Sequence, residues 1–217
     1  MPDQRLTLLL PLAAALAACQ TAAPPRPGAP AAAAVVVEPE EEWRRTALPE
    51  HASVTEDMPP LFAGLAAAAA RRSAADRELL AADAFLAAPA PAPGPYRCRL
   101  VRLPAPTAAA ARRERGGARQ AFCFVGADGE RLSLTLETPA RRLGGFLWPS
   151  ADARRLVFLG AGFAPPARTA PPYSASPGAN TAGLFERIGD FRYRLTVRGP
   201  NPGSVDVYEL MAAPAER

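Results

Sequence analysis

The stretch Arg131-Leu-Ser-Leu-Thr-Leu-Glu137 alternates apolar and polar side chains without a break, and Phe191-Arg-Tyr-Arg-Leu-Thr-Val-Arg198 does the same. Successive side chains of a strand point to opposite faces, so this period of two indicates strands with one buried and one solvated face. The side chains expected to face a core are Leu132, Leu134, Leu136, Phe191, Tyr193, Leu195 and Val197. The arginines expected to face solvent are Arg192, Arg194 and Arg198.

Weaker strand patterns surround these two stretches, at 96–103, 121–125, 145–148, 155–159, 184–188 and 205–210. Gly126–Gly129 and Gly199–Gly203 have the composition of hairpin connections. Gly144-Gly145 and Gly160-Ala-Gly162 are expected to mark turns or bulges. About eight short strands separated by turn signals predict a mainly β (α+β) protein, with an antiparallel barrel-like or sandwich domain over residues 94–217.

Short helices are expected before this domain, in residues 43–93. The helical part should begin near Trp43 and break around Met58-Pro59-Pro60, because proline removes a backbone donor and clashes with the preceding turn. The composition then favours helices over about 61–71 and 74–88. Ser73 is the expected N-cap of the second helix, with Asp76 three residues later.

The N-terminus has the layout of an export signal. Residues 1–18 place one arginine before an apolar stretch, which ends in the small residues Ala17 and Ala18. Leu16-Ala-Ala-Cys19 looks like a bacterial lipobox, in which Cys19 would carry the lipid that anchors the protein to the membrane. Gln20 favours the outer membrane, facing the periplasm, and residues 19–42 would be a Pro/Ala-rich tether. The alternative is a plain signal peptide with a chance cysteine.

Cys98 and Cys123 remain if Cys19 is lipidated. Both lie on expected strands in an oxidising compartment, so we expect a disulfide. A catalytic thiol is the poorer interpretation, because the one histidine, His51, lies before the strands. A metal site is also disfavoured, since two cysteines and one histidine do not complete a tetrahedral set. We expect neither a metal nor a cofactor.

Charge is divided along the chain. Residues 1–93 hold 7 Arg against 11 acidic residues, a net charge of −4, whereas 94–217 hold 18 Arg against 10, a net charge of +8. The candidate binding residues are Arg97, Arg99, Arg192, Arg194, Arg198 and Trp148. They would bind an anionic envelope polymer or a periplasmic protein. The alternative is an ordinary solvated strand face, and neither the compartment nor any aromatic-studded basic motif favours nucleic acid.

Motifs of common enzymes are absent from the sequence, which has no G-x-G-x-x-G, Walker A, G-x-S-x-G or H-E-x-x-H pattern. The candidates for a pair of catalytic carboxylates are Glu186, Asp190, Asp206 and Glu209. Ion pairs with Arg187 or Arg192 are the usual explanation for the first two. We therefore expect a protein that is not an enzyme, and a hydrolase with an unrecognised site is the third choice.

Five segments of the strand region form a recognisable series: Gly94–Leu103, Phe122–Val125, Arg154–Ala161, Ala182–Leu195 and Ser204–Leu210. They resemble successive motifs of domain-of-unknown-function family 4893. The resemblance covers about 43–214, and residues 104–111 and 165–177 depart from it. It implies a secreted or lipoprotein-type alphaproteobacterial protein, with a helical part before a β domain that carries two matching cysteines. It implies no reaction.

The function we expect is that of an envelope lipoprotein, a non-catalytic binding or scaffolding module. Its aromatic side chains would either fill the barrel or line a pocket, and filling is the usual case in small barrels. These side chains are Tyr96, Phe122, Phe124, Trp148, Phe158 and Tyr193. The alternative function is a periplasmic hydrolase or protease inhibitor of the small β-barrel type, by analogy of layout alone.

Overall fold

The computed structural model describes residues 39–68, 73–104, 121–176 and 178–213, with no side chains described for 39–41. The predicted leader 1–18, Cys19 and the tether as far as residue 38 lie outside the described residues.

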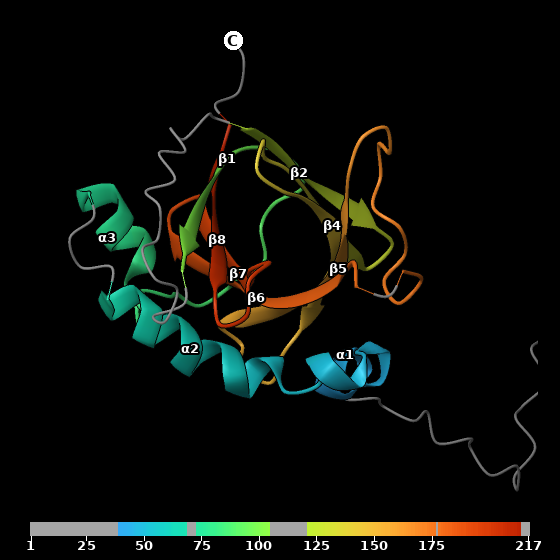
Figure 1. Ribbon diagram of the computed structural model, residues 1–217, viewed down its shortest axis with the longest axis horizontal. Coiled ribbons are helices and arrows are strands. Elements are labelled where there is room, and N and C mark those ends of the chain that lie inside the picture. Colours follow the sequence, from blue (N-terminus) through green and yellow to red (C-terminus); the bar gives the residue numbers. More distant parts are fainter. Residues whose placement is uncertain (1–38, 69–72, 105–120, 177, 214–217) are drawn as a thin grey trace, which may run out of the picture. The chain divides into compact units, whose positions relative to one another are not determined.

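Eight antiparallel strands close into a barrel in chain order, and β8 pairs with β1 to complete the ring (Figure 1). The strands are β1 (Gly94–Leu103), β2 (Ala121–Asp128), β3 (Arg131–Glu137), β4 (Arg142–Pro149), β5 (Arg155–Phe163), β6 (Asn180–Gly189), β7 (Arg192–Arg198) and β8 (Val205–Ala212). Each predicted strand is present, and the barrel alternative to a sandwich is confirmed. Closure leaves every strand with two neighbours, so no edge is exposed to pair with other chains.

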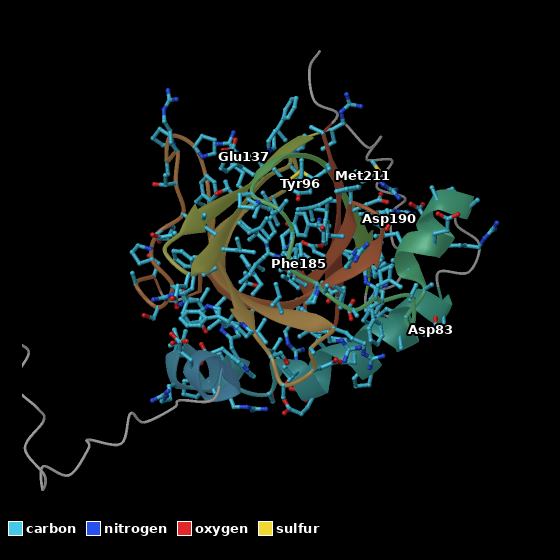
Figure 2. The ribbon with its side chains drawn as sticks, turned by 180° about the vertical axis from the view of Figure 1, so that it is seen from behind. Asp83, Tyr96, Glu137, Phe185, Asp190 and Met211 are labelled. Atoms are coloured by element: carbon cyan, nitrogen blue, oxygen red, sulfur yellow. A yellow bond between two sulfur atoms is a disulfide. The ribbon has the colours of Figure 1, made fainter. Side chains whose placement is uncertain are left out.

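The strand alternation separates two hydrophobic cores. Inside the barrel, side chains such as Leu134, Phe158 and Leu195 pack into one buried cluster, and Phe185 lies at its centre (Figure 2). Outside the barrel, residues of opposite parity such as Val157 and Val207 belong to a second cluster beneath the helices. On the side that the helices cover, both faces of the barrel wall are therefore buried.

Three helices and a 3₁₀ turn form the covering layer: α1 (Pro39–Thr46), η1 (Pro49–His51), α2 (Val54–Ala68) and α3 (Ala74–Leu80). In Figure 1, α2 runs along one side of the barrel, where it contacts β6, β7 and β8. Its buried residues, Val54, Met58, Phe62 and Leu65, recur at helical spacing and form one stripe. None of the described helices has the length and apolar composition needed to span a bilayer.

The predicted helix break at Met58-Pro59-Pro60 is wrong, because both prolines lie inside α2. They remove two backbone donors, but Pro60 is on the exposed side, where water can satisfy the freed carbonyl oxygens. Burial of Met58 and Phe62 on the opposite side holds the helix together across the prolines. The layer also begins earlier than expected, since α1 starts at Pro39, within the segment predicted as tether.

The helix predicted over 74–88 ends at Leu80. Its start is confirmed, because the Ser73 hydroxyl accepts a hydrogen bond from the Asp76 amide at 3.2 Å. The helix stops because the Arg194 guanidinium donates to the carbonyl oxygens of both Leu79 and Ala81, and Ala81 is extended. A long-range contact thus replaces the next helical turn.

The expected turns at Gly144-Gly145 and Gly160-Ala-Gly162 are also wrong, since these residues lie within paired strands, with Gly145 opposite Gly160. A Cβ on Gly160 would lie 2.5 Å from the ring of Phe158 and 2.4 Å from the Gly144 carbonyl oxygen. The glycines therefore let β4 and β5 approach closely while Phe158 fills the interior. Phe191, predicted to face inward, is 68% exposed because it lies with positive φ in the turn before β7.

Candidate binding face

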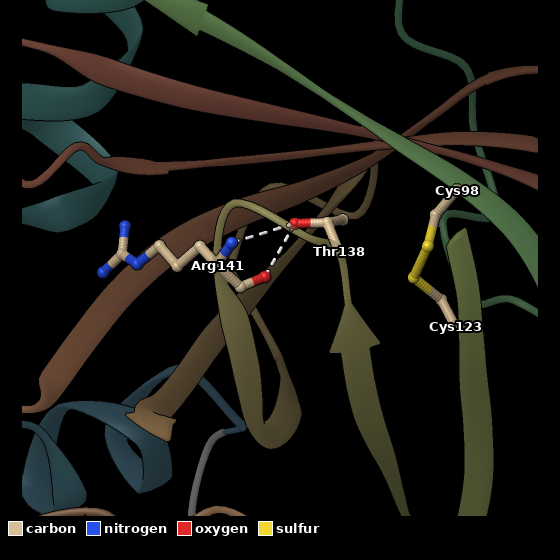
Figure 3. Close-up of a disulfide and its surroundings, with 4 residues drawn as sticks. All are labelled: Cys98, Cys123, Thr138 and Arg141. Atoms are coloured by element: carbon tan, nitrogen blue, oxygen red, sulfur yellow. Dashed lines mark hydrogen bonds between the residues drawn. A yellow bond between two sulfur atoms is a disulfide. The ribbon is translucent and has the colours of Figure 1, made fainter. Parts of the chain in front are cut away.

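The predicted disulfide is confirmed. Cys98 on β1 and Cys123 on β2 are bonded, with their Cα atoms 5.9 Å apart (Figure 3). Both cysteines belong to the interior cluster, so the bond joins neighbouring strands inside the barrel. Thr138 and Arg141 hold the β3–β4 turn, where the Thr138 hydroxyl donates to the Arg141 carbonyl oxygen at 2.7 Å.

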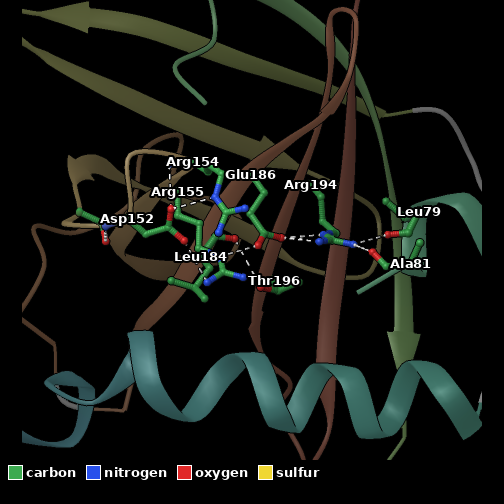
Figure 4. Close-up of polar contacts among 10 residues, drawn as sticks. Leu79, Ala81, Asp152, Arg154, Arg155, Leu184, Glu186, Arg194 and Thr196 are labelled. Carbon is green, nitrogen blue, oxygen red and sulfur yellow. Dashed lines mark hydrogen bonds and ion pairs between the residues drawn. The ribbon is translucent and has the colours of Figure 1, made fainter. Parts of the chain in front are cut away.

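Arg194, predicted to face solvent, is fully buried. It points outward from β7 as expected, but the helical layer covers that part of the wall, and its guanidinium lies 4.6 Å from the Phe62 ring centre of α2. Its Nε and Nη2 atoms both donate to Glu186 Oε2, at 2.8 and 2.6 Å (Figure 4). Burial lowers the pKa of Arg194, and the Glu186 charge opposes this. Arg194 is therefore a structural residue of the interface between layers.

Arg99 and Arg192 also form ion pairs with carboxylates of the chain. Each donates to a different oxygen of the buried Glu209 carboxylate, and each also reaches α3, Arg99 to Asp76 at 2.5 Å and Arg192 to Glu78 at 2.8 Å. Burial on its own would lower the pKa of Arg99, but the hydrogen bonds to Asp76 and Glu209 outweigh it and raise the pKa. These arginines dock α3 on the barrel.

The other carboxylates considered for catalysis also bind arginine. Asp206, buried at the inner face of β8, contacts Arg102 at 2.7 Å and Arg141 at 3.2 Å. Asp190 binds Arg187, as predicted. Glu186 instead binds Arg155 and Arg194, since its side chain points to the outer wall and away from Arg187.

Trp148 and Arg198 complete the predicted set. Trp148 is buried in the outer cluster, and the Arg131 guanidinium lies 4.7 Å from its ring centre, so Trp148 offers no exposed surface. Arg198 is exposed and lies 3.6 Å from Asp57 of α2. The remaining predicted binding residue, Arg97, is exposed on the outer face of β1.

Around Arg97 the strand register builds a continuous row of outward side chains. Met211 of β8 pairs with Arg97, Arg97 with Phe122 of β2, Phe122 with Glu137 of β3, and Glu137 with Arg142 of β4. Phe124, two residues after Phe122, shares its outward direction. We call Arg97, Phe122, Phe124, Glu137, Arg142 and Met211 the Phe122 face. Figure 2 shows Glu137 and Met211 on the side of the barrel opposite α1 and α2.

The Phe122 face is apolar and exposed at its centre. Phe122 is 74% exposed and Phe124 is 54% exposed, although aromatic side chains of this size are normally buried in cores. A groove of about 880 Å³ runs beside them, and its walls include Pro95, Pro139, Phe163 and Pro165. Its lining also includes polar residues such as Thr135, Glu137 and Arg142. Exposed aromatic side chains beside such a hollow are typical of an interaction site.

Two arginines flank the aromatic pair. Neither Arg97 nor Arg142 binds a carboxylate within the described ranges, and Arg142 lines the groove. The sequence indicated Arg97 but not Arg142. The expectation that the aromatic side chains fill the barrel holds for Tyr96, Phe158 and Tyr193. It is wrong for Trp148, which packs outside the barrel, and for Phe122 and Phe124, which are exposed. A signal was available: if Cys123 points inward to form the disulfide, alternation along β2 turns both Phe122 and Phe124 outward.

A second, smaller hollow of about 270 Å³ lies beside the one histidine. His51 Nδ1 and the Tyr173 hydroxyl are 2.6 Å apart, and Tyr173 also accepts from the Leu48 amide at 3.0 Å. Burial lowers the pKa of His51. This contact ties the β5–β6 connection to the helical layer. In the part of the chain that the structure describes, no three His, Cys, Asp or Glu side chains gather to hold a metal ion.

The fold defines a small disulfide-closed antiparallel barrel with a helical layer on one side. The chain belongs to the family described as "Domain of unknown function (DUF4893)", whose sequence profile matches residues 43–210. The match runs from α1 into β8 and confirms the family resemblance. Comparison with curated proteins and with solved structures gave no match.

Proposed function

We propose that the protein is a non-catalytic binding module of the cell envelope, anchored through a lipid on Cys19, and that it holds its partner on the Phe122 face. The observation that carries the proposal is the pair of exposed phenylalanines, Phe122 and Phe124, beside a groove. Fully burying an exposed phenylalanine side chain is worth about 1.5–3 kcal/mol, and a bound partner would recover part of this free energy at each position, since both side chains are already partly buried.

Export is supported by two independent features. The leader and Cys19 have the layout of a lipoprotein signal, and the Cys98–Cys123 disulfide is the kind of bond that persists outside the cytosol. Binding is favoured over catalysis because Glu186, Asp206 and Glu209 are each neutralised by two arginines. Carboxylates held in this way are poor general acids or bases.

Site-specific photo-crosslinking in cells tests the binding proposal. A photoreactive phenylalanine analogue is placed at Phe122 in the full chain, and a matched variant carries it at Leu86, an apolar residue that is 44% exposed beside the helical layer. We expect a discrete adduct from the Phe122 position and none from Leu86. Equal labelling at both positions, or no adduct at Phe122, would refute the proposal.

Anchoring is tested separately. Intact mass measurement of the mature protein should show an acylated Cys19 as its first residue, and Cys19→Ala should move the protein out of the membrane fraction. A mature protein without acyl chains would refute the anchor and leave the binding face to its own test.

A further inference from the structure

We infer that the Phe122 face docks on the phospholipid bilayer into which the lipid on Cys19 inserts. Phe122, Phe124 and Met211 enter the boundary between head groups and acyl chains, and Arg97 and Arg142 contact anionic head groups. This inference rests on the proposed function and names the partner of its binding face.

The first observation is where exposed apolar side chains gather. Among the described residues, the exposed large apolar side chains are those of Leu86, Phe122, Phe124, Phe191 and Met211. Met211 on β8 and Phe122 on β2 both pair with Arg97 of the strand between them. The carbonyl oxygen of Phe191 accepts from the amide of Ala212, the residue after Met211. Four of these five described side chains therefore come from neighbouring segments, and Leu86 is bridged to Arg187 instead.

The second observation is charge beside this apolar surface. Arg97 lies between Met211 and Phe122 in the row of outward side chains. Arg142 lies beyond Phe122, with Glu137 between them. An arginine can lay its apolar stem on such a surface while its guanidinium stays among the head groups. Two arginines against one glutamate leave a net charge of +1 on the face, so apolar contact should supply most of the binding and anionic lipid should strengthen it.

The third observation selects the bilayer among possible partners. Residues 20–38 precede α1, which begins at Pro39. A Pro-rich chain of this length reaches about 60 Å when extended, whereas a domain of this size is about 40 Å across. Any face of the domain can therefore touch the bilayer that holds Cys19. Because the tether keeps the local concentration of bilayer surface high, even weak contacts are populated.

A bilayer also asks little of the geometry. Its affinity for a surface depends on the buried apolar area and on attraction to anionic lipid, without complementary shape or fixed spacing. The Phe122 face offers both of these properties. A second protein would need a matching surface, and a heavily hydrated polymer would bury little of the phenylalanine side chains. Both are outcomes that the following experiment detects.

The identity of the photo-adduct is the first test. The photoreactive analogue replaces Phe122 in the full chain in cells, and the mass of the labelled protein is measured. We expect an increase equal to one phospholipid, and no such increase from the matched position Leu86. A protein or polymer adduct at Phe122 would overturn the inference and leave the binding face standing. No adduct at Phe122 would remove both.

The depth of docking is the second test. The acylated mature protein carrying Phe122→Trp is placed in vesicles of phosphatidylethanolamine and phosphatidylglycerol, with and without bromine on the acyl chains. We expect bromine to reduce the added fluorescence at least about twofold, because the side chain reaches the acyl boundary. Leu86→Trp is the matched control and should be unaffected. The native Trp43 and Trp148 are buried and contribute equally to both variants. Equal emission with and without bromine at position 122 would overturn the inference.

The arginines are tested in the same vesicles. Arg97→Gln/Arg142→Gln, added to Phe122→Trp, should lower the quenching when phosphatidylglycerol is present and leave it unchanged in phosphatidylcholine. The same quenching with and without the arginines in phosphatidylglycerol would contradict their role. The Cys19→Ala chain, added to these vesicles from solution, separates the face from the anchor, because it should dock more weakly but with the same dependence on Phe122. All variants should keep the wild-type circular dichroism spectrum, which excludes unfolding as the cause.

Discussion

Arg194 and Glu186 face each other across neighbouring strands of the barrel wall and share two hydrogen bonds to one carboxylate oxygen, beneath a helical layer that excludes water from both. The remaining Glu186 oxygen accepts from Arg155 at 2.8 Å. The carboxylate is therefore satisfied on both sides, and Arg194 extends the contact to α3 through two carbonyl oxygens. One buried ion pair thus joins β6, β7 and the end of α3.

Removing one member of this pair should be costly. Arg194→Leu leaves a buried carboxylate with one partner and two carbonyl oxygens without a donor. We expect the free energy of unfolding, measured in urea, to fall by about 3–5 kcal/mol. The double variant Arg194→Leu/Glu186→Leu should lose clearly less than the sum of the two single losses, because the second substitution removes the unpaired charge. Additive losses would contradict the coupling. Arg97→Ala, at an exposed position, should change stability by less than about 0.5 kcal/mol.

The glycine contact between β4 and β5 gives a second prediction. A Cβ at Gly160 would lie 2.4 Å from the Gly144 carbonyl oxygen and 2.5 Å from Phe158. Because strand backbone cannot yield easily, Gly160→Ala should destabilise the protein by about 1–3 kcal/mol. Gly64→Ala is the control: this residue of α2 has nothing within 4 Å of an added Cβ, and alanine should stabilise the helix by about 0.5–1 kcal/mol. Thermal unfolding of both variants measures the difference, and a neutral Gly160→Ala would contradict the close approach.

The disulfide is expected to contribute through the unfolded chain. Its cysteines are 25 residues apart, and closing a loop of that length stabilises by about 3 kcal/mol in the chain-entropy description. Cys98→Ala/Cys123→Ala should therefore lower the free energy of unfolding by roughly that amount. Peptide mapping without reductant should recover one linked pair from the wild-type protein. Free thiols at both positions in exported protein would overturn the assignment.

His51 gives a pH dependence whose direction is determined by burial. Burial lowers its pKa in the folded protein, nearby Glu50 acts to raise it, and Arg198 acts to lower it. The unfolded chain then binds the proton on His51 more readily than the folded protein does. The contribution of His51 to stability is therefore complete above about pH 6.5 and declines as the pH falls through the lowered pKa. Wild-type protein should lose stability faster than His51→Gln between pH 6.5 and 5. The same slope for both would show that His51 does not titrate in this way.

The positions of the strands were largely predictable from the chain, whereas the order in which they pair was not. Alternation over 131–137 and 191–198 placed Leu134, Leu136, Leu195 and Val197 inside, where they are, because a strand with one buried face must repeat with a period of two. The disulfide was also predictable from local patterns, since both cysteines lie on expected strands that are close in sequence. Pro59 and Pro60 were misleading, because the burial of α2 against the barrel outweighs the two lost hydrogen bonds.

What the sequence by itself determined is the set of strands, the alternation along 131–137 and 192–197, and the disulfide between Cys98 and Cys123. Those properties depend on local periodicity and on contacts between chain neighbours. Only the tertiary structure decided which outward side chains meet water. Arg194 and Phe122 both point away from the barrel axis, yet the first is fully buried and the second is 74% exposed. The physical reason is that the described helices pack on the wall over β4, β6, β7 and β8, and no local pattern records which part of a barrel a distant helix will cover.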